Sequence, residues 1–83
     1  MIKEFKVKVE VKLKAVVLDP QGKTVLGALH NLGYLEVQET RIGKLIELTV
    51  KDESELKVRE RVEEMCKKLL SNPVIEDFII KIE

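Results

Sequence analysis

Hydrophobic and polar positions alternate without interruption near the start of the chain. The apolar positions are Phe5, Val7, Val9, Val11 and Leu13, and the polar ones between them are Lys6, Lys8, Glu10 and Lys12. A sustained period of two is typical of a strand with one buried face and one solvated face. The pattern therefore predicts a half-buried strand over residues 5–13.

Helical signals follow at residues 19–33. Asp19 suits the N-cap position, and Pro20 suits the first helical position, because its missing N–H has no partner there. Gly33 stands where a helix C-terminus often needs a left-handed residue. These signals predict a helix over residues 20–32. Its apolar positions recur at helical spacing: Val25, Ala28, Leu29 and Leu32.

Residues 35–41 and 44–50 are rich in β-forming side chains and flank Ile42 and Gly43. Because glycine readily adopts a positive φ, the two segments are predicted to form a β-hairpin around Gly43. Ile46, Leu48 and Val50 are then expected in the core. Leu45 is expected to point outward with its polar neighbours.

A second helix is predicted after the polar residues 51–55, and it must end at or before Asn72, because Pro73 disfavours helical backbone there. Its apolar stripe comprises Val58, Val62, Met65, Cys66, Leu69 and Leu70. A last strand follows the corner at Asn72-Pro73. In that strand, Phe78, Ile80 and Ile82 alternate with Asp77, Ile79 and Lys81.

The order strand, helix, strand, strand, helix, strand predicts an α+β fold. The expected plan is βαββαβ ferredoxin-like (split βαβ), a single domain over residues 1–83, with both helices on one face of a four-stranded antiparallel sheet. Exchange of the last strand between protomers would leave the same pattern. Leu45 and Ile79 are expected on the uncovered face, where they are candidates for self-association.

Charge and composition narrow the function classes. Fifteen basic and fifteen acidic residues give a formal net charge of zero, with 45% hydrophobic and 36% charged residues. No cationic surplus favours nucleic acid or an anionic membrane as partner. No signal peptide or membrane-spanning segment is expected. The single cysteine, Cys66, cannot form an internal disulfide, so a cytoplasmic location is expected.

Candidate catalytic groups are few. His30, the only histidine, has no recognisable nucleophile or carboxylate partner, and Cys66 falls on an apolar helix stripe. One cysteine and one histidine do not make a zinc site, so no metal is expected. The glycines form no phosphate-binding motif, and too few aromatic residues are available for an RNA-binding sheet. A small-molecule-binding regulatory module of the ACT type stays open as an alternative function.

Four segments, each containing a proline or a glycine, together resemble the PurS family, the small subunit of bacterial and archaeal phosphoribosylformylglycinamidine synthase. The resemblance covers essentially the whole chain, except that many relatives carry a glycine where this chain has Ala15-Val16. The segments are Val17-Leu18-Asp19-Pro20-Gln21-Gly22-Lys23, Ala28-Leu29-His30-Asn31-Leu32-Gly33-Tyr34, Arg41-Ile42-Gly43-Lys44-Leu45-Ile46-Glu47-Leu48, and the stretch from Met65-Cys66 through Leu69-Leu70-Ser71-Asn72-Pro73-Val74-Ile75-Glu76-Asp77-Phe78.

The resemblance implies a non-catalytic subunit that forms homodimers or larger homo-oligomers. It would bridge a glutaminase subunit (PurQ-like) and an ATP-dependent synthetase subunit (PurL-like), so that ammonia passes between them in purine biosynthesis. No cofactor is expected on this chain, since ATP, magnesium and glutamine would be used by the partners. The residues expected to contact partners lie at the predicted corners: Asp19, Gln21, Gly22, Lys23, Arg41, Lys44, Asn72, Glu76 and Asp77.

Overall fold

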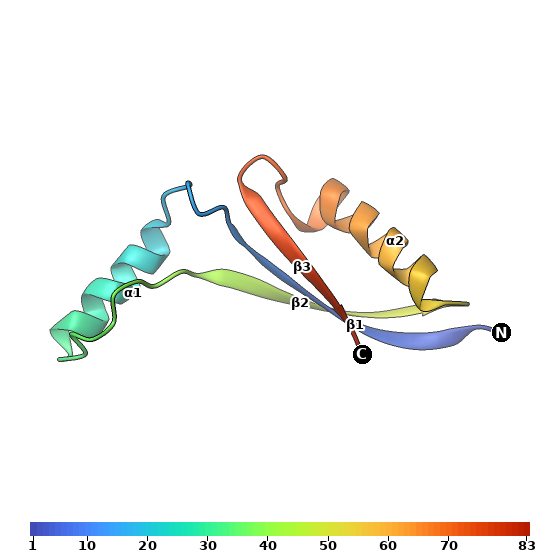
Figure 1. Ribbon diagram of the computed structural model, residues 1–83, viewed down its shortest axis with the longest axis horizontal. Coiled ribbons are helices and arrows are strands. Elements are labelled where there is room, and N and C mark those ends of the chain that lie inside the picture. Colours follow the sequence, from blue (N-terminus) through green and yellow to red (C-terminus); the bar gives the residue numbers. More distant parts are fainter.

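Three strands form one antiparallel sheet in the spatial order β2-β1-β3. The structure is a computed structural model that describes residues 1–83. Figure 1 shows the sheet with one helix lying over it and the other helix far to one side. The elements are β1 (Lys3–Leu13), α1 (Pro20–Asn31), β2 (Gly43–Asp52), α2 (Glu55–Met65), a π-helical turn, η1 (Cys66–Leu70), and β3 (Glu76–Ile82).

The core lies between β1 and the helix that covers the sheet. Val7, Val9 and Val11 of β1 are buried, as the alternating pattern predicts, and they form one cluster with Val58 and Val62 of α2. Cys66 completes this cluster, and burial raises the pKa of its thiol. Half-buried side chains pack around it from all three strands and from the end of the helix: Phe5, Ile46, Leu48, Val50, Leu70, Phe78, Ile80 and Ile82.

The second helix buries a narrower stripe than its sequence predicts. Met65 and Leu69 are exposed, so their predicted place in the core is wrong. Positions 58, 62, 66 and 70 face the sheet instead, and each four-residue step overshoots an α-helical turn by about 40°. The wider turn of η1 offsets this drift and is closed by the bond from the Ser71 N–H to the Cys66 carbonyl, 2.9 Å.

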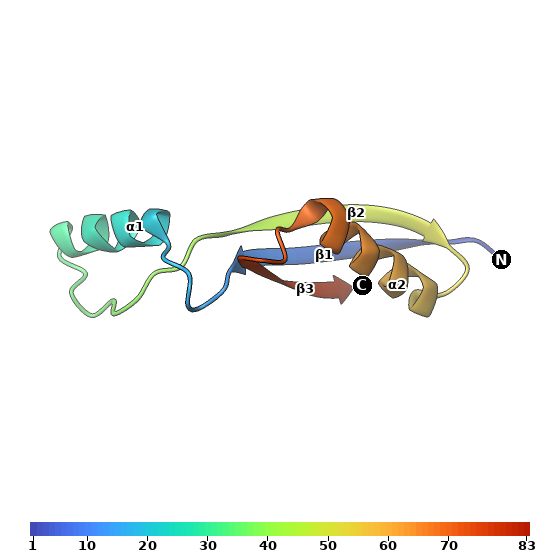
Figure 2. The same ribbon diagram turned by 90° about the horizontal axis from the view of Figure 1, so that it is seen from above.

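Residues 14–42, named here the arm, extend away from the sheet and α2, which together form the body (Figures 1 and 2). Residues 35–41 form no strand, and α1 does not cover the sheet, so the chain lacks the predicted fourth strand and second covering helix. The α+β plan of helices and antiparallel strands is confirmed. Residues 35–41 run within the arm instead of folding back along β2 (Figure 1). The outer edge of β2 therefore stays unpaired, while its inner edge pairs with β1 from Lys3 opposite Asp52 to Lys12 opposite Gly43.

Gly33, which follows α1, and Gly43, which opens β2, have different roles. Gly33 adopts φ 98°, so its predicted left-handed position after α1 is confirmed. Gly43 has no positive φ, and the predicted turn there is wrong. It opens β2 instead, where a Cβ atom would lie 2.5 Å from the carbonyl oxygen of Val11. Glycine is therefore required at position 43 by the close approach of β1.

The chain is elongated. Its extents are 54 × 25 × 14 Å and its radius of gyration is 16.5 Å, against roughly 12 Å for a compact domain of this length. Only nine of 83 residues are buried. No helix is long and apolar enough to cross a membrane. One copy of the chain therefore leaves much of its surface available to other chains.

Candidate partner interface

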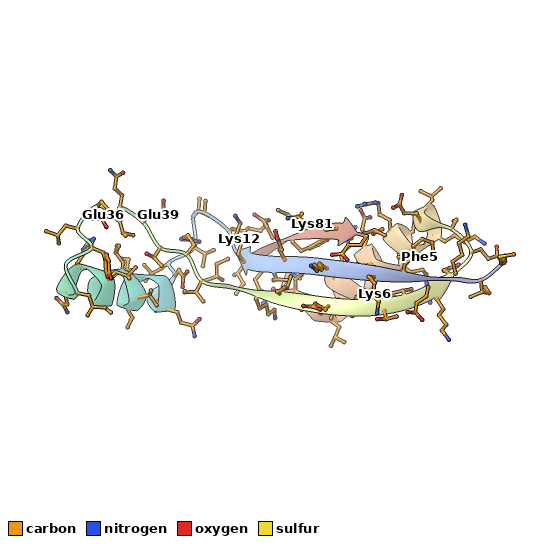
Figure 3. The ribbon with its side chains drawn as sticks, turned by 90° about the horizontal axis from the view of Figure 1, so that it is seen from below. Phe5, Lys6, Lys12, Glu36, Glu39 and Lys81 are labelled. Carbon is orange, nitrogen blue, oxygen red and sulfur yellow. The ribbon has the colours of Figure 1, made fainter.

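The face of the sheet opposite α2 carries two exposed apolar side chains in one cross-strand row. Leu45 of β2 and Ile79 of β3 both pair with Glu10 of β1 and are 54% and 50% exposed, so their predicted outward position is confirmed. The other side chains of this face are mostly charged. Lys81 forms an ion pair with Glu10 at 3.1 Å, and Figure 3 shows the labelled Lys6, Lys12 and Lys81 along the strands.

A hollow of about 520 Å³ lies beside this row, at the end of the sheet from which the arm departs. It brings together Leu45, Ile79, Arg41, Lys44 and Asp77, which the sequence analysis takes from three separate segments. A neighbouring hollow of about 250 Å³ is lined by Asp19, Gln21, Lys44 and Glu76, among others. Most of the predicted contact residues therefore converge on the junction between arm and body.

Asp19 is buried at this junction, with 5% of its surface exposed. One carboxylate oxygen accepts the Gly22 N–H at 3.0 Å and caps α1, which confirms the predicted N-cap. The other accepts the Ile42 N–H at 2.8 Å, from 23 residues further along the chain. Hydrogen bonds from Ile42 and then Gly22, with a smaller effect of the Arg41 charge, lower the pKa of Asp19.

Arg41 reaches across the junction from the opposite direction. Its guanidinium donates hydrogen bonds to the carbonyl oxygens of Leu13 at 3.1 Å, Lys14 at 2.9 Å and Val17 at 3.4 Å. These carbonyls belong to the end of β1 and the segment that leads into α1. Much of the hydrogen-bonding capacity of Arg41 is thus used within its own chain.

The corner at Asn72 forms as its sequence predicts, after the helix has ended at Leu70. The Asn72 carbonyl accepts the N–H groups of Ile75 and Glu76, and its side-chain oxygen accepts the Val74 N–H at 3.1 Å. The Glu76 carboxylate accepts the Asn72 N–H at 2.6 Å. The corner is tied to the arm junction by the Lys14 N–H, which donates to the Ile75 carbonyl at 2.9 Å.

The predicted contact residues divide into two groups by what they already bind. Asp19, Gly22 and Arg41 are buried or half-buried and hold the junction together. The others leave polar groups at the surface, and they stay candidates for partner contacts: Gln21, Lys23, Lys44, Asn72, Glu76 and Asp77.

The arm presents exposed apolar residues that are not among the predicted contact residues. Val16, Leu18, Leu32, Tyr34 and Leu35 are all more than half exposed, and Val16 reaches 93%. The sequence around Leu35 predicts a strand that does not form. Its exposure follows from the absent strand partner, which the sequence pattern does not reveal.

Two ionisable side chains that sequence inspection raises as catalytic candidates have structural partners. The Nε2 atom of His30 lies 2.7 Å from the Val37 carbonyl oxygen and so ties the end of α1 to the returning segment, with Nε2 as the donor. Cys66 is fully buried under the sheet. No group of three histidine, cysteine, aspartate or glutamate side chains is placed to hold a metal ion.

Comparison with known proteins identifies the family. The model of the PurS family, described as phosphoribosylformylglycinamidine (FGAM) synthase, matches residues 6–83. Phosphoribosylformylglycinamidine synthase subunit PurS of Methanocaldococcus jannaschii is 51% identical over 95% of both chains. The subunit of the same name from Bacillus subtilis is 53% identical over 95% of this chain and 93% of its own length.

Solved structures agree with the sequence matches. A chain in the structure of PurLQS from Thermotoga maritima superposes with a TM-score of 0.91 at 34% identity, covering 98% of this chain and 99% of that one. These relatives give no support to an ACT-type regulatory module. Because both the family model and the close relatives span nearly the whole sequence, this chain belongs to the PurS family, as a subunit of phosphoribosylformylglycinamidine synthase.

Proposed function

We propose that the chain is a non-catalytic assembly subunit that bridges the glutaminase and the ATP-dependent synthetase subunits of phosphoribosylformylglycinamidine synthase. The observation that carries the proposal is the near-complete match to a chain of the PurLQS structure. In this arrangement, ammonia released from glutamine passes to the synthetase site without loss to solvent. ATP, magnesium and glutamine are used by the partner subunits, and the assembly works in the cytoplasm.

The chemistry of the side chains supports a structural role. Glutamine hydrolysis requires an activated nucleophile, and ATP use requires ligands for phosphate and magnesium. The one thiol of the chain is buried and its pKa is raised, which disfavours the reactive thiolate. The one imidazole is bonded to a backbone carbonyl. What the chain offers partners is therefore shape and surface.

Self-association is the second part of the proposal. A three-stranded sheet with one covered face leaves its other face and both outer edges available to a second copy. Leu45 and Ile79 lie on that open face. We expect the double variant Leu45→Ser/Ile79→Ser to weaken the homodimer by about tenfold or more, since each buried aliphatic side chain favours association by more than that factor.

Sedimentation velocity over a dilution series measures this effect. Thr49→Ser is the matched control, because Thr49 is exposed on the same strand, β2, four residues from Leu45. A double variant that dissociates at the same concentration as the wild type would remove the open face from the homodimer interface.

Partner contacts are tested at the surface residues of the junction. The charge reversal Lys23→Glu/Lys44→Glu changes two exposed side chains without touching Asp19 or Arg41. We expect weaker binding of the partner subunits, because mismatched charges at an interface slow and weaken association. Lys3→Glu/Lys51→Glu reverses two exposed charges at the far end of the sheet and serves as the control.

The activity of the partner subunits shows whether the chain is needed as an assembly subunit. The partner subunits are assayed with glutamine and, separately, with ammonium, each with and without this chain. A bridging subunit is needed for the glutamine-dependent reaction, whereas free ammonium bypasses the transfer. Glutamine-dependent product formation that is indifferent to the chain would overturn the proposed function.

A further inference from the structure

The arm is held at its angle to the body without a hydrophobic core of its own. Among residues 14–42, only Asp19 and Gly22 are buried, and neither contributes an apolar side chain to a core. Two backbone segments, residues 14–19 and 40–42, connect the arm to the sheet (Figure 1). The orientation of the arm is therefore set by the contacts that these two segments make with each other and with the adjoining end of the body, where the Lys14 N–H donates to the Ile75 carbonyl.

Those contacts run in both directions. The side chain of Asp19, on the outgoing segment, accepts the N–H of Ile42 on the returning segment at 2.8 Å. The side chain of Arg41, on the returning segment, donates to carbonyl oxygens at the end of β1 and on the outgoing segment, the closest being Lys14 at 2.9 Å. Two neighbouring connections that are bonded to each other in both directions resist both twisting and splaying.

Gly22 lets the segments approach closely enough for these bonds. A Cβ atom at position 22 would collide with the carbonyl oxygen of Thr40 and would lie 2.7 Å from a carboxylate oxygen of Asp19. The third residue of α1, the returning segment and the carboxylate thus share one tightly filled space. This packing explains why a helix accepts glycine at a position where it lowers helix propensity.

We propose that Asp19 and Arg41 form a reciprocal brace that fixes the angle between arm and body. They act as positioning residues, because the arm carries exposed side chains that the brace places at a set distance from the open sheet face. Its effect on the assembled enzyme rests on the proposed function. The brace itself is a property of the isolated chain.

Two variants separate the brace from simple helix capping. Asp19→Ser retains a good N-cap for α1 but has no second oxygen to accept the Ile42 N–H. Its matched control is Ser54→Asp, the reverse exchange at the N-cap of α2, where Ser54 accepts the Lys57 N–H at 3.3 Å. Arg41→Lys retains the charge but loses the fork that reaches several carbonyls. Its control is Arg61→Lys, on the exposed face of α2.

Distances between two nitroxide labels read the angle directly. One label is placed at Gly27→Cys on α1, where nothing lies within 4 Å of an added Cβ, and the other at Glu60→Cys on the exposed face of α2. The native Cys66 is fully buried and stays unlabelled. The labelled chain is refolded with an excess of unlabelled chain, so that only distances within one protomer are measured.

We expect one narrow distance distribution in the parent and in both controls, and a broadened or shifted one in Asp19→Ser and in Arg41→Lys. Amide exchange at Ile42 should accelerate by about tenfold or more in Asp19→Ser, since a hydrogen bond to a charged acceptor is lost. Unchanged distributions in both brace variants would overturn the proposal, and so would equal broadening in the controls. If α1 melts in Asp19→Ser, Arg41→Lys decides, because it leaves the N-cap intact.

Binding of the partner subunits tests the positioning role. We expect both brace variants to bind them more weakly than the controls do. A loosened arm with unchanged partner binding would overturn positioning. A wild-type chain that fails to bind the partners would instead overturn the proposed function, while the distance measurements on the isolated chain would still stand.

Discussion

The body and the arm are stabilised by different kinds of interaction. In the body, six apolar or weakly polar side chains at most 2% exposed pack on one another across β1 and α2. In the arm, the two buried residues are an aspartate and a glycine, and directed hydrogen bonds cross the junction. Burial of apolar surface is strong but nearly indifferent to direction, whereas hydrogen bonds add less free energy and impose geometry. The body therefore provides stability, and the arm provides a defined shape.

The largest expected effect is a core truncation in the body. Val62→Ala removes two buried methyl groups from a fully buried position. It should lower the free energy of unfolding by about 2 kcal/mol and the melting temperature by about 10 °C. Thermal unfolding followed by circular dichroism measures this, with the exposed neighbour Glu63→Ala as control. Equal loss in both variants would mean that α2 is held by something other than the core.

Two glycines of α1 offer the sharpest test of the arm. Gly22→Ala should destabilise the chain by about 1–3 kcal/mol, because the new methyl group meets the Thr40 carbonyl. Gly27→Ala has open space around it and should stabilise the helix by about 0.5–1 kcal/mol. Urea unfolding of the two variants gives the comparison. If both variants changed the free energy of unfolding with the same sign, the close approach of α1 to the returning segment would be contradicted.

A smaller effect is expected from pH. The pKa of Asp19 is lowered in the folded chain, so its contribution is fully present above its unfolded pKa of about 4 and is lost as the pH falls through the folded value. The difference in unfolding free energy between the wild type and Asp19→Ser should therefore shrink on acidification. Urea titrations at neutral and at strongly acidic pH measure it. A difference that grows in acid would refute the assigned direction.

The smallest effect is expected from an exposed ion pair on the outer face of α2 and η1. Lys68 lies 3.3 Å from Glu64, one helical turn earlier, and both are largely solvated. Lys68→Gln should lower the free energy of unfolding by about 0.3–0.5 kcal/mol, and less at high salt. Urea unfolding at low and high salt measures the change. A loss comparable with that of Val62→Ala would show that the body does not depend chiefly on its apolar core.

Local patterns in the sequence predict the body well. The alternation along β1, the core positions of β2 and the corner after Leu70 all depend on neighbouring residues, and each appears in the structure as expected. Helix capping by Asp19 and the left-handed Gly33 are equally local. Interactions between residues close in sequence recur in any chain with the same local pattern. They can therefore be predicted from the sequence alone.

The arm is where prediction from the sequence fails. Residues 35–41 contain β-forming side chains, but a strand forms only where a partner strand lies alongside, and these residues lie in the arm, away from the free outer edge of β2 (Figure 1). The same limit applies to the candidate site. Asp19 and Arg41 were predicted as contact residues, yet their bonds to Ile42 and Lys14 span more than 20 residues and carry no signature in sequence.

The sequence by itself determined the helices, the amphipathic strands, the caps and the family, because these depend on the order of neighbouring residues. The tertiary structure alone decided that α1 does not cover the sheet, that β2 lies beside β1, and that Leu45 and Ile79 share one row across Glu10. Strand pairing and burial are fixed by which distant segments meet, and that choice depends on the free energy of the whole chain.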